Sequence, residues 1–219
     1  MFDYIVKNED DTSSSLIIVF NSLADDGSVD NSKYDFEKTF ENLETRTMFF
    51  KNLDYTWFLN DFSDIEAIVC KIIINSNVKN VYIIGHSCGG FAGLIFPFLI
   101  RDLVKETTCY IFSPQTNLEE KFIISNVETI GNPEDMSLFV NHENILDENT
   151  KYYTCKDFML DNVNYNIYFC KQNRWDTSFI DELGNCKVNV FGQECDHHAS
   201  AYFCKCTNQF NTIFKELFP

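Results

Sequence analysis

Short β-prone runs alternate with helix-period segments along this chain, and that alternation limits the possible folds more than any other feature. Runs rich in Ile, Val, Phe and Tyr are expected to be strands at residues 16–20, 46–52, 81–85, 108–113, 165–170 and 186–191. Helical periodicity appears at 61–77, 89–106 and 199–218. Continuously apolar strands that alternate with helices are typical of a mostly parallel sheet covered on both faces. The sequence therefore predicts an α/β fold.

The length of 219 residues lies near the upper end of what one hydrophobic core supports, and no linker-like segment divides the chain. We therefore expect a single domain over residues 1–219. The least regular region is 117–164, in which only 133–140 has a helical pattern. This region is short, so it predicts a small cap or a loop insertion and little or no lid.

Charge and hydropathy exclude several classes of partner. The chain carries 17 Lys and Arg against 33 Asp and Glu, a formal net charge of −16. Such a field repels phosphate backbones and anionic lipid, which argues against nucleic-acid binding. No apolar run approaches the roughly 18 residues of a membrane span.

The amino terminus has no basic region followed by an apolar core, so no signal peptide is predicted. The nine cysteines are scattered and odd in number, and we interpret them as reduced thiols. These features favour a soluble cytoplasmic protein.

The segment Gly85-His86-Ser87-Cys88-Gly89 has the form G-x-S-x-G and lies between an expected strand and an expected helix. In a nucleophile elbow the serine sits on a strained strand-to-helix turn, where flanking glycines avoid a collision. The Cys88 N–H, near the start of the helix, can then donate to an oxyanion. A chance pentapeptide or a merely tight loop is the alternative. Cys88 is a rival nucleophile, but the glycine frame fits Ser87 better.

A nucleophilic serine needs a base, and in elbow-type folds the histidine follows the last strand. His86 lies inside the elbow with its side chain expected to point away from Oγ, and His142 has no strand before it. His197 and His198 both follow the last expected strand. We favour His197, which places Phe203 on the inward side of the last helix, and keep His198 as the alternative base.

The acid is expected between the serine and the histidine, after a late strand. Asp176 follows the strand ending at 170 by a short loop, whereas Asp181 and Glu182 fall inside the helix that follows. Asp176 is therefore the predicted acid. The alternative role for Asp176 is a helix N-cap.

The second oxyanion donor is expected from the loop after 16–20. The backbone N–H of Ser22 or Leu23 is the candidate, with Asn21 as a possible side-chain donor. This loop lacks the H-G-G-G form of many esterases.

A metal site is the competing interpretation of the carboxyl-terminal cysteines and histidines. Five potential ligands fall within twelve residues: Cys195, His197, His198, Cys204 and Cys206. However, Cys-x-Cys on a helix diverges by about 200°, and the C-x₂₋₄-C spacing of structural zinc sites is missing. The sequence predicts neither a metal nor a cofactor.

The whole chain resembles the α/β-hydrolase superfamily. The segments "DYTWF", "GHSCGGFAGLIF", "FSPQ", "RWD" and "DHHASAYF" are more narrowly similar to small bacterial hydrolase-like proteins. Members of that group are associated with surface polysaccharide or glycoprotein assembly and are similar to the esterase-like component of accessory secretion systems. The resemblance implies that Asp54, Trp57 and Gln115, together with Asn21, contact the substrate.

These features predict a serine hydrolase that cleaves a small, acetyl-like ester, on a carbohydrate carrier, through an acyl-enzyme. An O-acyltransferase that passes the acyl group to a sugar would use the same residues and is the first alternative. A non-catalytic scaffold of this fold is the second, but it would have no reason to keep Ser, Asp and His in order. The oligomeric state is not predicted.

Overall fold

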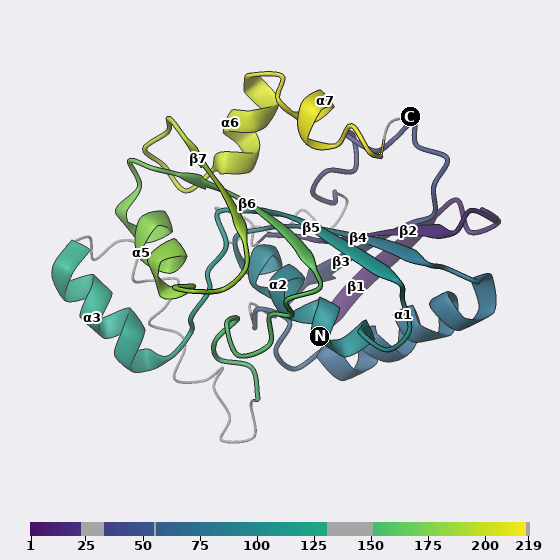
Figure 1. The fold of residues 1–219 in the computed structure, drawn as a ribbon, viewed down its shortest axis with the longest axis horizontal. Coiled ribbons are helices and arrows are strands. Elements are labelled where there is room, and N and C mark those ends of the chain that lie inside the picture. Colours follow the sequence, from purple (N-terminus) through teal and green to yellow (C-terminus); the bar gives the residue numbers. More distant parts are fainter. Residues whose placement is uncertain (23–32, 55, 131–150, 218–219) are drawn as a thin grey trace.

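The described part of the chain is built on one seven-stranded sheet with the order β1-β3-β2-β4-β5-β6-β7 (Figure 1). The computed structural model describes residues 1–22, 33–54, 56–130 and 151–217. The strands are β1 (Phe2–Lys7), β2 (Ser15–Phe20), β3 (Thr47–Asn52), β4 (Asn80–His86), β5 (Glu106–Phe112), β6 (Asn164–Cys170) and β7 (Asn189–Gln193). Only β1 runs antiparallel to its neighbour, β3, and the other pairs are parallel. The predicted α/β class with a mostly parallel sheet is confirmed.

Both faces of the central strands are covered, which explains why these strands are continuously apolar. Residues Leu16 and Ile18 of β2 pack into one core cluster, and Ile17 and Val19, on the opposite face, pack into a second. Successive side chains of a strand point to opposite faces, so a strand buried on both sides must be apolar throughout.

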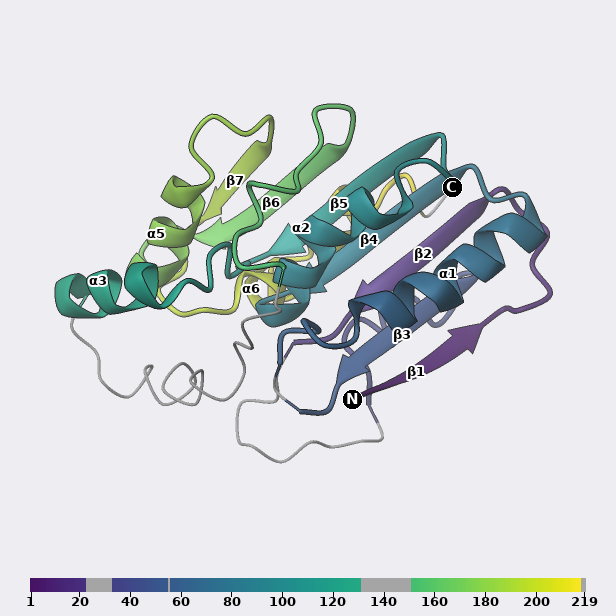
Figure 2. The same ribbon diagram turned by 90° about the horizontal axis from the view of Figure 1, so that it is seen from below.

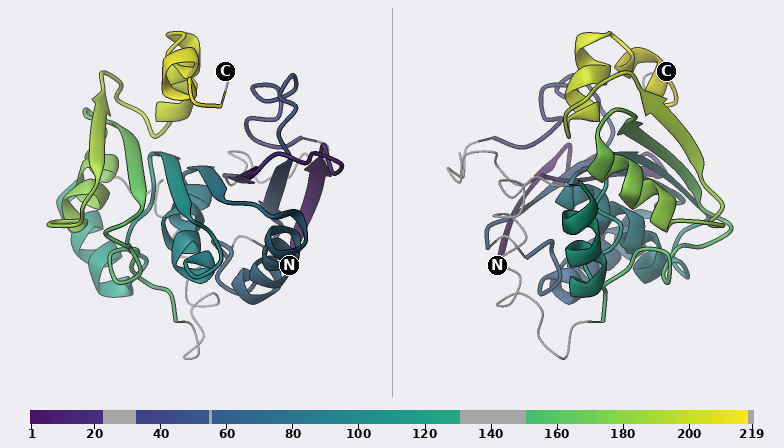
Figure 3. Two further views of the ribbon diagram at one scale, coloured as in Figure 1. Left: turned by 45° about the vertical axis from the view of Figure 1, so that its right-hand side comes forward. Right: turned by 90° about the vertical axis from the view of Figure 1, so that its left-hand side faces the viewer.

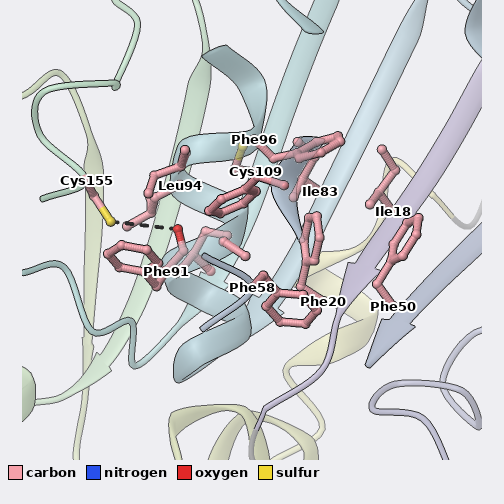
Figure 4. Packing of buried hydrophobic residues seen from close by; sticks show 14 of the residues in the cluster. Ile18, Phe20, Phe50, Phe58, Ile83, Phe91, Leu94, Phe96, Cys109 and Cys155 are labelled. Atoms are coloured by element: carbon pink, nitrogen blue, oxygen red, sulfur yellow. Dashed lines mark hydrogen bonds between the residues drawn. The ribbon is translucent and has the colours of Figure 1, made fainter. Parts of the chain in front are cut away.

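The first face of the sheet is covered by α1 (Phe62–Ser76) and α2 (Cys88–Ile100), as Figure 2 shows from below. Towards β6 and β7 this layer continues with α5 (Arg174–Glu182), against which α3 (Glu120–Ile130) lies. Phe20 lies edge-on to Phe58 and to Phe96, so the side chains of β2 and α2 interlock (Figure 4). This packing fixes α2, and with it the turn that precedes α2.

The opposite face carries α6 (Ser200–Cys206) and α7 (Phe210–Ile213), drawn in yellow in Figure 3. Residues 34–43 pack beside them, and the ring of Phe40 lies edge-on to Phe214 at 5.2 Å. Two chain segments separated by about 170 positions in the sequence therefore share this face.

The six expected strands are all present, with differences at the edges of the sheet. Strand β1 was not expected, and β7 begins three residues later than predicted. The expected helix 89–106 ends at Ile100, and the expected helix 199–218 is divided into α6 and α7. Asn208 lies between these two helices with a φ of 58°, a left-handed conformation that ends a helix.

The region 117–164 contains α3 and an isolated bridge between Asn117 and Thr154. The expected helical segment 133–140 lies outside the described residues. The single-domain interpretation of 1–219, with 117–164 as a cap or insertion, therefore stays a prediction.

The cysteines differ from expectation. Cys170, at the end of β6, and Cys195, after β7, form a disulfide, whereas the other seven are free thiols. The expectation of fully reduced cysteines is therefore wrong for this pair, because the neighbouring parallel strands β6 and β7 bring their carboxyl ends together. Disulfides persist mainly in oxidising compartments, which runs against the expected cytoplasmic location. Within the described residues, every helix is too short or too polar to cross a membrane.

Candidate active site

The carboxyl ends of β2, β4, β5 and β6 meet at one edge of the sheet, and the candidate residues gather there. The chain passes from β2 to β3 on one side and later to β4 on the other, so the strand order reverses between β2 and β4. Ligands of open α/β sheets bind outside the carboxyl ends of the strands at such a switch point. Ser87 follows β4 directly and therefore lies at this position.

Ser87 has the backbone conformation of a nucleophile elbow. Its φ of 55° and ψ of −119° are unusual for a residue with a side chain. A Cβ at Gly85 would lie 2.2 Å from the carbonyl oxygen of Gly89, and a Cβ at Gly89 would lie 2.1 Å from that of Phe20. Both positions therefore require glycine, and the tight turn presents Ser87 at the start of α2.

His198 connects the serine to the acid. Its Nε2 lies 2.8 Å from Ser87 Oγ, and its Nδ1 lies 2.5 Å from Asp176 Oδ1. His197, which the sequence favoured as the base, instead places its Nδ1 3.1 Å from Asp196 and is exposed. The preference for His197 is thus corrected to His198, because the loop after β7 turns only the second imidazole towards Ser87.

Asp176 is almost fully buried, at 1% exposure, and is held by several donors. Its Oδ2 accepts hydrogen bonds from the Ser113 hydroxyl at 2.6 Å and from the Cys170 N–H at 2.9 Å. Burial alone would raise the pKa of the carboxyl, but these hydrogen bonds and the neighbouring His198 outweigh it, so the pKa of Asp176 is lowered. The carboxyl is kept ionised and oriented.

The alternative role of Asp176 as a helix cap is not what the structure shows. The N-cap of α5 is Asn173, whose side chain accepts a hydrogen bond from the Asp176 N–H at 2.9 Å. Asp176 instead lies in the first turn of α5, from which its side chain reaches the carboxyl ends of β5 and β6.

A buried pair of serines supports the acid, and sequence reasoning did not find it. Ser113 Oγ donates to Asp176 and lies 2.8 Å from Ser200 Oγ, which in turn donates to the Tyr168 carbonyl at 3.0 Å. Both serines are fully buried. The sequence marks Ser113 only within the segment FSPQ after β5, on the substrate side of the site, and Ser200 only as the residue that begins the helix after the two histidines.

Of the groups expected to stabilise an oxyanion, Cys88 is placed as the prediction requires, but Ser22 and Asn21 have other partners. Cys88 is the first residue of α2, so its N–H lies at the helix start, as the oxyanion role would require. The N–H of Ser22, however, donates to Asp35 Oδ2 at 2.6 Å, and the Asn21 side chain accepts from the Asp35 N–H. In this arrangement the Ser22 N–H is already hydrogen-bonded to the Asp35 carboxylate and does not serve as an oxyanion donor. Leu23 lies outside the described residues.

A cavity of about 730 Å³ reaches the imidazole of His198. Its lining combines three histidines with lysines, acids and aromatic residues from the segment 33–39 and from α6. The His86 ring centre lies 5.6 Å from that of His198, so His86 faces the site although its side chain was expected to point away. The cavity therefore adjoins His198, whose Nε2 lies 2.8 Å from Ser87 Oγ.

The residues expected to contact substrate do not line the cavity beside His198. Trp57 and Gln115 are buried and joined by a hydrogen bond from the indole nitrogen to the amide oxygen. Asp54 pairs with the amino terminus and accepts from Thr56. None of these side chains, nor Asn21, lines the cavity beside His198. Contact of these residues with substrate stays a prediction.

The carboxyl-terminal cysteines and histidines do not converge. Cys195 is in the disulfide, Cys204 is buried and Cys206 is exposed. Across the described residues, no group of three or more His, Cys, Asp or Glu side chains is arranged to hold a metal ion.

Comparisons with solved structures identify the fold. An esterase from Pyrococcus furiosus is 10% identical, with a TM-score of 0.58, over 93% of this chain and 82% of that one. Est1E from Butyrivibrio proteoclasticus is 16% identical, with a TM-score of 0.54, over 96% and 93%. S-formylglutathione hydrolase from Staphylococcus aureus is 14% identical, with a TM-score of 0.52, over 99% of both chains. No protein-family profile and no curated protein sequence matches the chain.

The mostly parallel sheet, its helices on both faces and the elbow after β4 make this the α/β-hydrolase fold. At these identities the likeness extends to the fold alone. The chemistry must be argued from the site.

Proposed function

We propose that the protein is a serine hydrolase that cleaves esters through an acyl-enzyme formed on Ser87. The observation that carries this proposal is the position of His198, which lies within hydrogen-bonding distance of both Ser87 Oγ and Asp176. Nucleophile, base and orienting acid arranged in this way are what acyl transfer requires.

In the proposed reaction, His198 is neutral, its Nδ1–H donates to Asp176 and its Nε2 accepts the Ser87 hydroxyl proton. Ser87 Oγ attacks the ester carbonyl, and the Cys88 N–H at the start of α2 stabilises the oxyanion. When the intermediate collapses, the alkoxide leaves with the proton from His198. Water then attacks the acyl-enzyme with His198 again as base, which releases the acid and restores Ser87.

For the substrate, we propose a small acyl group, acetyl-like, on a polar carrier such as a carbohydrate. The lining of the cavity beside His198 combines charged and hydroxyl side chains with the rings of Tyr34 and Tyr202. Hydrogen-bonding groups beside aromatic rings can bind a polar carrier such as a sugar, with the rings packing against its apolar faces. The carbohydrate carrier also follows from the resemblance of the sequence to proteins of surface glycan assembly.

The test is a burst experiment with p-nitrophenyl acetate. The unaltered protein should release nitrophenolate in a burst equal to the enzyme concentration, and Ser87→Ala should abolish it. His198→Ala should lower turnover by about a thousandfold or more, as in other serine triads. The matched control is His197→Ala, the adjacent histidine that borders the cavity but contacts Asp196 instead of Ser87, and its turnover should stay far above that of His198→Ala.

Equal losses in the two histidine variants, or full cleavage by a folded Ser87→Ala protein, would contradict the mechanism. Adding sugar acceptors after the burst separates water from a sugar hydroxyl as the second substrate. We expect acetate to be the product. Acetylated sugar formed at the expense of acetate would instead identify an O-acyltransferase.

A further inference from the structure

The charge of the cavity beside His198 differs from that of the rest of the chain. The whole sequence has 17 cationic against 33 acidic side chains. Among the described residues that line the cavity the balance is reversed, because Lys33, Lys38 and Lys205 stand against two acids, Asp35 and Glu37. Cations are therefore concentrated where a ligand would lie.

The two acids of the lining already have partners. Asp35 accepts hydrogen bonds from the backbone and the hydroxyl of Ser22 at 2.6 and 2.7 Å. Glu37 pairs with Lys7 at 2.9 Å, and this hydrogen bond is the main reason why the pKa of Glu37 is lowered. Glu37 is thus balanced by a cation outside the cavity, and Asp35 is held by neutral donors.

Lys38 and Lys205, by contrast, form no ion pair with any residue in the described ranges. They come from elements far apart in the sequence, the segment 33–39 and α6, which lie on the same face of the sheet (Figure 3). The contact between Phe36 and Phe210, with ring centres 5.7 Å apart, holds the two elements together. Two lysines from different parts of the chain therefore border one cavity, and His198 belongs to the same lining.

We propose that the ester cleaved at Ser87 carries an anionic group, a carboxylate or a phosphate, which binds in this cavity to Lys38 and Lys205. The inference rests on the proposed function and adds the charge of its substrate. A neutral ester could only accept hydrogen bonds from these lysines, whereas an anion would also gain their charge attraction in a molecule whose net charge of −16 otherwise repels it.

The experiment uses matched ester pairs that differ in one charge. For the alcohol side, 4-acetoxybenzoate is compared with its methyl ester. For the acyl side, the 4-nitrophenyl monoester of adipic acid is compared with its methyl ester. The quantity measured is kcat/KM for the anionic ester divided by kcat/KM for the neutral one. Comparing this ratio between variants cancels the difference in intrinsic reactivity, and the pair that responds shows which side of the ester carries the anion.

The variants are Lys38→Gln, Lys205→Gln and the double substitution. Each single change should lower the anionic-to-neutral ratio by about two- to fivefold, the range of a solvent-exposed ion pair, and mainly through KM. The control is Lys121→Gln on α3, an exposed lysine that does not line the cavity and should leave the ratio unchanged. An unchanged ratio in the double variant, for both ester pairs, would overturn the proposal.

A binding measurement separates this proposal from the proposed function. In Ser87→Ala protein, calorimetry with 4-acetoxybenzoate and its methyl ester reports recognition without turnover. Tighter binding of the anion, weakened in the double lysine variant, supports the anionic substrate even if the unaltered protein cleaves no ester. Equal binding of the two compounds counts against it. Failure of Ser87 chemistry appears instead as loss of the burst with the neutral ester.

Discussion

Asp176, the proposed acid of the site, is held by hydrogen bonds other than its contact with His198, the proposed base. Asp176 gives one carboxylate oxygen to His198, and the other accepts from the Ser113 hydroxyl and the Cys170 N–H. Such bonds to a buried charge are stronger than bonds to neutral groups, because little solvent competes for the carboxylate. Ser113 is therefore a positioning residue that acts through Asp176.

Replacing Ser113 with Ala should lower the free energy of unfolding and reduce kcat on the acid side of the pH profile. The Ser113 hydrogen bond is among the causes that lower the Asp176 pKa, so its loss raises that pKa, and the loss of kcat caused by protonation of Asp176 in the acid limb should begin at a higher pH. A carboxyl with a lowered folded-state pKa stabilises the fold above its unfolded-state pKa and loses this effect as the pH falls through the folded value. The variant should therefore lose about 2 kcal/mol in urea unfolding at pH 7.

The control for this experiment is Ser178→Ala. Ser178 lies on the same helix as Asp176, but its hydroxyl donates to the Trp175 carbonyl at 3.0 Å. Its removal should leave the pH profile where it was. A Ser113→Ala protein whose acid limb does not move would show that Ser113 serves packing alone.

Some residues of the site follow from the sequence, and others depend on contacts that it does not encode locally. Ser87 is marked by glycines that the elbow requires, and Asp176 by its position after a late strand. His197 and His198 are neighbours on an irregular loop, so their directions depend on how that loop is held. Engagement of the Ser22 N–H by Asp35 likewise depends on a contact thirteen residues away.

At the level of elements, the proposed acid and base follow neighbouring strands, β6 and β7, whose carboxyl ends are covalently joined. Cys170 ends β6 and donates its N–H to Asp176, and Cys195 precedes His198 by three residues. The Gln172 N–H also donates to the Cys195 carbonyl at 3.1 Å. The disulfide therefore links the segment that holds the acid to the loop that holds the base.

Removing the disulfide by Cys170→Ala with Cys195→Ala should lower stability and turnover together. Closing a loop of 25 residues is worth about 3 kcal/mol, which corresponds to a Tm lower by roughly 6–12 °C in a chain of this size. Assayed well below that Tm, kcat should still fall, because the His198 loop loses its anchor to β6. Thermal unfolding and burst kinetics measure the two effects.

The matched control is Cys206→Ala, which removes an exposed free thiol. Its Tm and turnover should equal those of the unaltered protein. If the double variant keeps its full kcat, the disulfide stabilises the fold without positioning the base.

The elements themselves were predictable to the extent that they are buried. The central strands are apolar on both faces and stand out in the sequence, whereas β1 and β7 lie at the edges of the sheet and mix exposed with partly buried residues. The disulfide was not predictable, because it depends on the pairing of β6 with β7. The cavity combines the segment 33–39 with α6, and only the fold brings these two together.

At the level of the whole molecule, the net charge of −16 means that repulsion between like charges lowers the free energy of unfolding. Few of the 33 acidic side chains are compensated by close cations within the described ranges. Salt should therefore act on the fold by screening repulsion more than by weakening ion pairs.

Raising NaCl from 10 to 100 mM at pH 7 should increase the Tm, because the Debye length falls from about 30 to about 10 Å. We expect a rise of about 2–4 °C, equivalent to roughly 1 kcal/mol in a chain of this size. Repeating the titration near the sequence pI of about 4.5 provides the control, since the net charge is then close to zero and the rise should disappear or change sign. Differential scanning calorimetry at the two pH values measures both. A Tm that falls with salt at pH 7 would mean that attractive pairs outweigh the net repulsion, contrary to the excess of 33 acids over 17 cations.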